Sequence, residues 1–243
     1  MLAPANGCPG HVAYLRGVNP SENHRIDAVL LDLYDTVAWV PRAVLLRERL
    51  AGRVGVEPEA LRKAWATTYR ARTIGELESL EAEIAAILGA CGVAAEKELV
   101  SELTVMEWST WREVELFDDA LPFMARQRAL GRSVAIVSNC SRQTQEVVRV
   151  HGLEEAADLV ILSCDVGVAK PDAGIFEAAL EGLGVEPQRA IFVDDVPTYL
   201  DGAAALGIQT AHIAREGLEV ADTDRHRRIG SLTDLEAVLG PVG

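Results

Sequence analysis

The feature that most constrains the fold is a short apolar run that ends on an acidic residue. Residues 28–31 read Ala-Val-Leu-Leu, and Asp32 follows directly. An apolar run of this length, bounded by an acidic turn, predicts a buried parallel strand. The carboxyl ends of central strands face the binding crevice in an open α/β sheet. We therefore expect Asp32 to lie in a crevice, although an aspartate at a strand end can also be an ordinary turn residue.

From about residue 118, short apolar strands alternate with helices. Strands are predicted over 133–137, 159–162, 190–193 and 208–213, with helices over 142–151, 173–183, 200–206 and 233–239. This order implies right-handed crossovers between parallel strands. The predicted fold class is therefore α/β, with a Rossmann-like three-layer α/β/α core, a parallel sheet and an inserted α-helical cap domain.

The cap is predicted because a helical block interrupts this alternation. It opens at Pro41, reaches about residue 115 and is expected to hold about four helices. Leucine and isoleucine recur at three- and four-residue spacing over 77–91, while Glu76, Glu78, Glu81 and Glu83 take the other face, which we expect to be solvated. The predicted domains are a loose N-terminal leader over 1–25, a core over 26–40 and 116–243, and the helical cap over 41–115. A cap at this place can close over the crevice and exclude water.

The sequence also predicts which aromatic residues and arginines of the chain are buried and which are exposed. We expect most of Trp65, Tyr69, Trp108 and Trp111 to be core, with the alternative that one of them faces a ligand. Arg47, Arg62, Arg70 and Arg72 are interpreted as solvated helix faces, and Arg225-His226-Arg227-Arg228 as a surface turn.

The charge balance weighs against polyanionic partners. The chain of 243 residues has 23 basic and 37 acidic residues and a formal net charge of −14. Such a surface repels phosphate backbones and anionic lipids, so we expect neither a nucleic-acid nor a membrane partner. Four scattered cysteines without a CxxC pair indicate reduced thiols. Together with the lack of a signal-like or membrane-spanning run, this favours a cytoplasmic protein; the oligomeric state is not indicated.

Polar residues of types that take part in catalysis or ligand binding follow the predicted strands in a fixed order. They form four pieces: Asp32-Leu33-Tyr34-Asp35-Thr36; Ser138-Asn139; Lys170-Pro171 within VAKPDAGIF; and Asp194-Asp195 within FVDDVPTYLDGAAALGI. Each piece alone has an ordinary explanation, such as a helix cap, a solvated lysine or a turn. Together, over residues 26–213, they resemble the haloacid dehalogenase superfamily of aspartate-nucleophile hydrolases.

The resemblance implies a role for each piece. Asp32 is the expected nucleophile, and Ser138 with Asn139 the expected binder of phosphoryl oxygens. Lys170 is expected to bind substrate and to neutralise charge shared by Asp32 and the transferring group. Two further residues complete the expected metal site: Asp194 and Asp195 are to hold Mg²⁺ with an oxygen of Asp32 and the backbone carbonyl of Tyr34.

One position departs from the phosphatase pattern. Phosphatases of the superfamily usually carry a second aspartate two residues after the nucleophile as general acid and base, and this chain has Tyr34 there. A tyrosine at that place resembles the metal-free 2-haloacid dehalogenases, whose leaving halide needs no proton. Asp35, one residue later, is the candidate for the missing acid and base. Capping of the turn is the favoured interpretation of Asp35, and a cap residue or the substrate is then the source of the proton.

The hypothesis from sequence is a Mg²⁺-dependent phosphatase that acts on a small phosphorylated metabolite through an aspartyl-phosphate at Asp32. The acidic pair Asp194-Asp195 favours it, because the dehalogenases lack such a metal-binding pair. Two alternatives stay open: a metal-independent 2-haloacid dehalogenase, and a catalytically weak binding or regulatory protein on the same fold.

Overall fold

A computed structural model describes residues 25–41, 43–218, 221 and 223–239 of the chain. The predicted leader, apart from its last residue, lies outside the described residues. Within the described part, no helix is long and apolar enough to cross a membrane.

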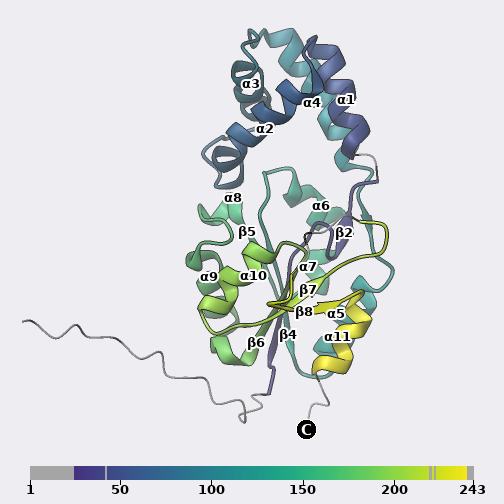
Figure 1. Ribbon diagram of the computed structural model, residues 1–243, viewed down its shortest axis with the longest axis vertical. Helices are drawn as coiled ribbons and strands as arrows, with labels where there is room; N and C mark the ends of the chain where they lie inside the picture. The colour runs from purple at the N-terminus through teal and green to yellow at the C-terminus, as the bar shows by residue number, and fades with distance from the viewer. Residues whose placement is uncertain (1–24, 42, 219–220, 222, 240–243) are drawn as a thin grey trace, which may run out of the picture.

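Six parallel strands form the centre of the lower lobe in Figure 1, in the order β5-β4-β1-β6-β7-β8. The strands are β1 (Ala28–Leu31), β4 (Ser133–Ser138), β5 (Leu159–Leu162), β6 (Ala190–Asp194), β7 (Gln209–Ile213) and β8 (Arg227–Ile229). All pairings in this sheet are parallel, and β1 lies between β4 and β6. The apolar run that opened the sequence argument is therefore the middle of the sheet.

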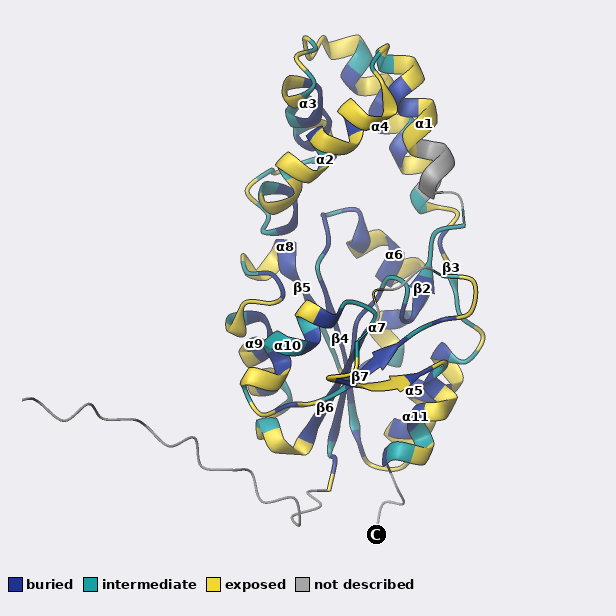
Figure 2. Ribbon diagram, viewed as in Figure 1, coloured by how far each residue is buried: buried dark blue, intermediate teal, exposed yellow. Residues whose placement is uncertain are grey.

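Helices cover both faces of this sheet, which gives the three layers predicted from the sequence. Alternate residues of β1 point to opposite faces: Val29 and Leu31 pack in one hydrophobic cluster, and Ala28 and Leu30 in the other. The first face is covered by α5 (Ala120–Ala129), α6 (Thr144–Val150), α7 (Leu153–Ala156) and α11 (Leu232–Leu239). The second is covered by α9 (Ala173–Leu183) and α10 (Pro197–Ala205), and Figure 2 shows the central strands β4 and β6 buried between the two layers.

Four helices form the upper lobe, which we call the helical cap. They are α1 (Ala43–Val54), α2 (Pro58–Thr73), α3 (Leu80–Ala90) and α4 (Lys97–Trp111). The cap has a hydrophobic core of its own, which includes Leu50, Leu61, Ile84 and Leu103. The chain enters and leaves the cap through two short antiparallel strands, β2 (Ala38–Trp39) and β3 (Glu115–Leu116).

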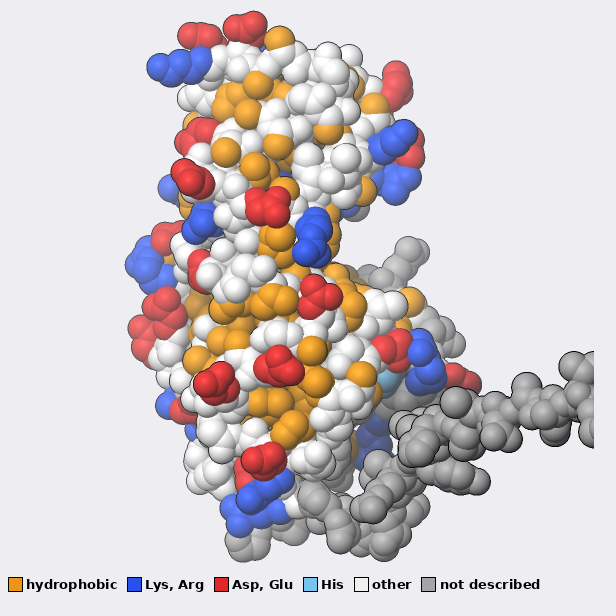
Figure 3. Space-filling model, turned by 90° about the vertical axis from the view of Figure 1, so that its left-hand side faces the viewer, with side chains coloured by type: hydrophobic (Ala, Val, Ile, Leu, Met, Phe, Trp, Pro, Cys, Tyr) orange, Lys and Arg blue, Asp and Glu red, His pale blue; other side chains and the backbone are white. Residues whose placement is uncertain are grey.

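A narrow waist joins the two lobes, and hydrophobic side chains gather over it in Figure 3. At the waist, the last turn of α2 contacts α8 (Ser163–Val166) of the core. The Ser163 hydroxyl, fully buried, donates a hydrogen bond to the Thr73 carbonyl at 2.6 Å and accepts one from the Cys140 amide. Gly75 has φ of +73°, and a Cβ there would lie 2.1 Å from the Cys164 carbonyl oxygen. Cap and core therefore touch too closely at this point for a larger residue.

One prediction about the end of the chain is wrong. The Arg225–Arg228 cluster is not a surface turn, because Arg227 and Arg228 begin β8, whose Ile229 is buried. His226 is buried too and lies between the Thr210 hydroxyl and the Asp201 carboxylate. A short 3-10 helix, η1 (Pro187–Arg189), lies between α9 and β6.

Candidate active site

The site lies at the carboxyl ends of the three central strands. In register, Leu31 at the end of β1 pairs with Ile136 of β4 on one side and with Val193 of β6 on the other. The residues that follow these positions, Asp32, Ser138 and Asp194, are therefore delivered to one edge of the sheet. This convergence agrees with the sequence-based expectation, because parallel strands of a doubly wound sheet end at the same edge.

Lys170 bridges two of the carboxylates. Its Nζ atom lies 2.5 Å from Asp32 Oδ1 and 2.6 Å from Asp194 Oδ2, and its side chain is 1% exposed. Burial alone would lower the pKa of Lys170, but the attraction of Asp194 and Asp32 outweighs burial and raises it. The lysine is therefore a fixed positive charge between the first and fourth sequence pieces.

Asn139 and two aromatic rings hold this lysine in place. The Asn139 side chain accepts a hydrogen bond from the Lys170 backbone amide at 2.7 Å and donates one to its carbonyl at 2.9 Å. The ammonium also lies 5.0 Å from the centre of the Tyr199 ring and 5.2 Å from that of Phe192. The structure thus engages the Asn139 amide with Lys170, although the sequence analysis expected it to bind phosphoryl oxygens.

Three carboxylates gather around this charge. Asp32, Asp194 and Asp195 each offer an oxygen, and these oxygens lie within 4.8 Å of one another. Burial, reinforced by the neighbouring carboxylates and opposed by Lys170, raises the pKa of Asp32 to about 7. Burial and the charges of Asp32 and Asp194 raise that of Asp195 to about 8. Three acidic groups against one ammonium leave excess negative charge when ionised.

This donor set fits a divalent cation that prefers oxygen ligands. Carboxylate oxygens are the ligands of Mg²⁺, and the ion's charge would compensate the repulsion that raises the pKa of Asp195. Asp194 is already fixed, because its Oδ1 accepts a hydrogen bond from the Val196 amide. Asp195, by contrast, is half-buried, and its backbone carbonyl lies 3.1 Å from His212 Nε2.

Ser138 lies at the end of β4 and is fully buried. Its Oγ atom has no hydrogen-bond partner among the described residues. A buried hydroxyl without a partner is unfavourable, which indicates that a group absent here completes the site. The position and the unsatisfied hydroxyl suit an oxygen-rich ligand beside Asp32.

Tyr34 does not take over the role of an acid. Its hydroxyl lies 2.9 Å from the Thr144 Oγ1 atom, and its ring packs 5.5 Å from that of Trp111. Burial raises the pKa of Tyr34, so the phenol keeps its proton. Asp35 has φ of +60°, and its amide donates to the Ala38 carbonyl at 2.6 Å. Burial and the charge of Asp32 raise the pKa of Asp35, whose side chain borders the cavity described next.

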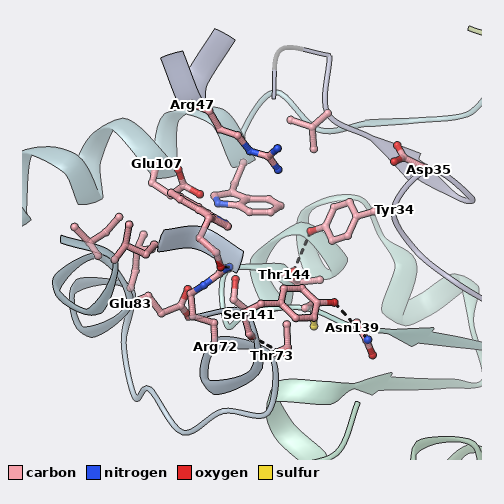
Figure 4. Close-up of a pocket in the computed structure, with 18 residues that line it drawn as sticks. Tyr34, Asp35, Arg47, Arg72, Thr73, Glu83, Glu107, Asn139, Ser141 and Thr144 are labelled. Carbon is pink, nitrogen blue, oxygen red and sulfur yellow. Dashed lines mark hydrogen bonds between the residues drawn. The ribbon is translucent and has the colours of Figure 1, made fainter. Parts of the chain in front are cut away.

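A cavity of about 350 Å³ opens between the cap and this site. Figure 4 shows its two sides: Tyr34, Asn139, Ser141 and Thr144 come from the core, and Arg47, Arg72, Glu83 and Glu107 from the cap. Each cap helix contributes one of those four charged residues. The cavity has the size of a small-molecule site and adjoins the loops that carry Asp32 and Ser138.

Three expectations about the cap are corrected here. Arg72 is 6% exposed, not solvated, because its guanidinium lies over the Trp65 ring and donates to the Trp65 carbonyl. Glu83, expected on a solvated face, is 2% exposed. Of the four aromatic residues, Trp65 and Trp111 are half-buried and pack against the hydrophobic clusters, as expected, but they also line the cavity with Tyr69. Tyr69 and Trp108 are not core residues, because they are 41% and 36% exposed.

Sequence reasoning missed the cap side of the cavity for a physical reason. An apolar stripe predicts which face of a helix is buried against its neighbours, but a helix that also borders a cavity buries part of its polar face. The position of Glu107 was a weak sequence indication of a cavity residue, since it lies one turn before Trp111 on a helix whose other face is apolar.

A strand-end aspartate, a buried lysine and an acidic pair beneath a helical cap are the arrangement expected of a hydrolase of the haloacid dehalogenase type. The chain belongs to the haloacid dehalogenase-like hydrolases, whose family model matches residues 26–207. The resemblance and the fold class predicted from the sequence are thereby confirmed, and the protein is an enzyme.

Both branches of the family occur among its relatives. The enolase-phosphatase E1 of Sorangium cellulosum is 29% identical over 204 residues, which cover 80% of this chain and 86% of that protein. The (S)-2-haloacid dehalogenase 4A of Burkholderia cepacia is 26% identical, over 78% and 84% of the two chains. The crystal structure of a HAD phosphatase from Thermococcus onnurineus shares the fold, with a TM-score of 0.65 at 22% identity over 90% of this chain and all of that one.

Proposed function

We propose that the protein is a Mg²⁺-dependent phosphatase that hydrolyses a small-molecule phosphate monoester. The observation that carries this proposal is the cluster in which Lys170 bridges Asp32 and Asp194 beside Asp195. A phosphoryl group is anionic, so a buried aspartate can attack it only where positive charge offsets the repulsion. The fixed ammonium supplies one such charge at the required place.

In the proposed reaction, a carboxylate oxygen of Asp32 attacks phosphorus. The new oxygen–phosphorus bond forms as the ester oxygen leaves with the bond's electrons and takes up a proton, which gives an aspartyl-phosphate and an alcohol. Water then attacks phosphorus, releases inorganic phosphate and restores the carboxylate. Ser138 donates a hydrogen bond to a phosphoryl oxygen, which satisfies its buried hydroxyl, and Asn139 positions Lys170.

The proton for the leaving alcohol is assigned to Asp35 or to the substrate itself. Tyr34 is unsuited because burial keeps its phenol protonated and Thr144 holds its hydroxyl. Burial and the charge of Asp32 raise the pKa of Asp35, which is the direction a general acid needs. Asp35 also borders the cavity that adjoins the site.

Mg²⁺ would be held by Asp32, Asp194 and Asp195 with the backbone carbonyl of Tyr34. Bound there, it supplies charge that stabilises the phosphoryl oxygens. This completes the neutralisation that Lys170 begins.

A second candidate function rests on one observation. Tyr34 stands where the phosphatases have an acid, and its hydroxyl is turned to Thr144 as a fixed wall of the cavity. That arrangement suits a leaving group that needs no proton, such as a halide. The alternative is therefore a metal-independent 2-haloacid dehalogenase.

Release of phosphate and release of chloride distinguish the two. The enzyme is assayed with a panel of metabolite phosphates and with 2-chloropropionate, each with Mg²⁺ and with EDTA. The proposal expects phosphate release that EDTA abolishes and that falls at least ~10⁴-fold in Asp32→Asn. Asp172→Asn, an exposed aspartate two residues after Lys170, is the matched control and should keep full activity. Chloride release that EDTA leaves unchanged would establish the dehalogenase instead.

A further inference from the structure

The cavity between cap and core is lined by more acidic than basic side chains. Its acidic side chains are Asp35, Glu83 and Glu107, and its basic side chains are Arg47 and Arg72. Arg47 is exposed, so water screens it, whereas Glu83 and Glu107 are 2% and 3% exposed. The buried part of the lining therefore holds two carboxyl groups and a single guanidinium.

That guanidinium has other partners. Arg72 donates from Nη2 to the Trp65 carbonyl at 3.0 Å and from Nε to the Thr68 hydroxyl at 3.3 Å, and it stacks on the Trp65 ring. It lowers the pKa of both carboxyl groups through space, but the described structure has no ion pair between it and Glu83 or Glu107. The arginine is thus a fixed part of the wall that attracts both glutamates through space without a direct ion pair to either.

Both glutamates keep an oxygen without a partner. Gln143 donates to Glu83 Oε2 at 3.4 Å, whereas Glu83 Oε1 and Glu107 Oε2 are buried and accept no hydrogen bond within the described chain. The Trp111 indole nitrogen in the same wall is also buried without a partner among the described residues and lowers the pKa of Glu107, but burial, as the largest cause, still raises that pKa to about 7. Buried acceptors are normally satisfied, so two such oxygens lining one cavity indicate that a donor belongs there.

The remaining walls are aromatic. Tyr34, Trp65, Tyr69 and Trp111 line the same cavity. The faces of such rings attract cations, and together with carboxylates they form the surroundings in which proteins hold amines and quaternary ammonium groups. A phosphate or carboxylate group would find fewer favourable contacts here, because the buried Arg72 already donates its hydrogen bonds to residues of its own helix.

We propose that the cavity binds the alcohol part of a phosphate monoester that carries an ammonium group, which lies between Glu83, Glu107 and the aromatic walls. This deepens the proposed function and rests on it: the phosphoryl group lies on Asp32, and the amine extends toward the cap. About 350 Å³ suits an amino alcohol with a few carbon atoms. The substrate class is therefore phosphorylated amino alcohols.

Matched esters test the inference. The probes are 2-aminoethyl phosphate against n-propyl phosphate, and phosphocholine against its uncharged isostere 3,3-dimethylbutyl phosphate, with phosphoglycolate as the anionic counterpart. We expect kcat/KM for the ammonium ester of at least one pair to exceed that of its neutral partner at least ~10-fold, carried mainly by KM. Equal rates within each pair, or a preference for phosphoglycolate, would overturn the inference while leaving the phosphatase intact.

Variants locate the effect. Glu107→Gln and Glu83→Gln keep the shape but remove charge, and each should raise KM for the ammonium ester about 10-fold and leave KM for the neutral ester unchanged. Glu81→Gln, an exposed residue of the same helix as Glu83, should change neither. Thermal melting identifies a variant that fails to fold, and the comparison of esters in the unaltered enzyme needs no variant.

A binding measurement separates this inference from the proposed function. Choline and 3,3-dimethylbutan-1-ol are titrated into the Asp32→Asn protein, with Trp65 and Trp111 as fluorescent reporters in the cavity wall. Tighter binding of choline, lost in Glu107→Gln, supports the amine site even if no ester is hydrolysed. Equal binding of the two alcohols contradicts it even if phosphate is released from other esters.

Discussion

At the scale of single residues, the centre of the site is a charge balance around Lys170. The ammonium contacts Asp32 and Asp194, and Asp195, which it does not contact, has a pKa raised to about 8, above the value of about 7 for Asp32. Removing Lys170 would leave buried like charges with no compensation, which is costlier than losing an exposed ion pair. The residue thus serves folding and the proposed chemistry together.

The residues after the strands were predictable, and those of the cavity were not. Asp32, Ser138 and Asp194 could be expected to converge because their strands are adjacent and parallel. The orientation of the Tyr34 ring toward Thr144 and Trp111 depends on packing between cap and core, which no local pattern encodes.

Tyr34→Asp tests whether the missing acid limits turnover. A carboxyl group at this place should raise the rate on alkyl phosphates by about 10²-fold, the usual scale of positioned proton transfer. The rate on p-nitrophenyl phosphate should change little, because its leaving group departs without a proton. Initial rates on the two ester classes give the ratio.

Tyr34→Phe is the control for that substitution. It removes only the hydroxyl that contacts Thr144, and we expect rates within about threefold of the unaltered enzyme, because a phenol that keeps its proton does not act as a base. A loss of ten-fold or more in Tyr34→Phe would show that the hydroxyl takes part in the reaction.

At the scale of elements, α10 supports the loop that carries Lys170. A Cβ at Gly202 of α10 would lie 2.4 Å from the Pro171 carbonyl oxygen and 2.9 Å from the Pro171 Cβ. The helix therefore packs directly on the residue next to Lys170, and glycine is required for the close approach and not for an unusual φ.

Gly202→Ala should displace this loop. We expect a loss of about 1–3 kcal/mol in the free energy of unfolding, as for other overpacked sites, and a fall in kcat of about 10-fold or more because the ammonium moves from the carboxylates. Denaturant unfolding and steady-state rates measure the two effects. Gly52→Ala, on α1 with no atom within 4 Å of the added Cβ, should leave kcat unchanged and stability equal or up to ~1 kcal/mol higher. Equal behaviour of both variants would contradict the role given to α10.

Elements with an apolar signature were predicted well, and polar ones were missed. The expected strand over 159–162 matches β5, and the expected helix over 173–183 matches α9. Strand β8 was not predicted because two of its three residues are arginines, and its place at the edge of the sheet leaves them exposed. A strand that buries only Ile229 has too short a pattern to recognise.

At the scale of the whole molecule, a protein with a net charge of −14 concentrates acidic groups at a buried centre. Burial raises the pKa of Asp32 to about 7 and that of Asp195 to about 8, whereas an unfolded chain titrates near pH 4. Between these values the folded, metal-free protein holds protons that the unfolded chain releases. The contribution of these two groups to the free energy of unfolding therefore falls as pH rises from about 4 to about 8.

Magnesium should reverse this dependence, because it binds the ionised carboxylates. We expect Mg²⁺ to raise Tm more at pH 8.5 than at pH 5.5, relative to EDTA. Asp195→Asn should remove most of the Mg²⁺ effect at pH 8.5. Glu107→Gln should leave it intact, because Glu107 belongs to the cavity and not to the oxygen cluster. An equal Mg²⁺ effect at the two pH values would contradict the proposed ion site.

The paired strands β2 and β3 connect the cap to the core at one place, since the chain leaves the core and returns to it along adjacent strands. An insertion held in this way, with an interior of its own, is a module that evolution can exchange without disturbing the sheet. Under the proposed function, the cap recognises the alcohol and the sheet carries the residues that break the ester bond, so a change in the cap would change the substrate and leave the carboxylates and the lysine as they are.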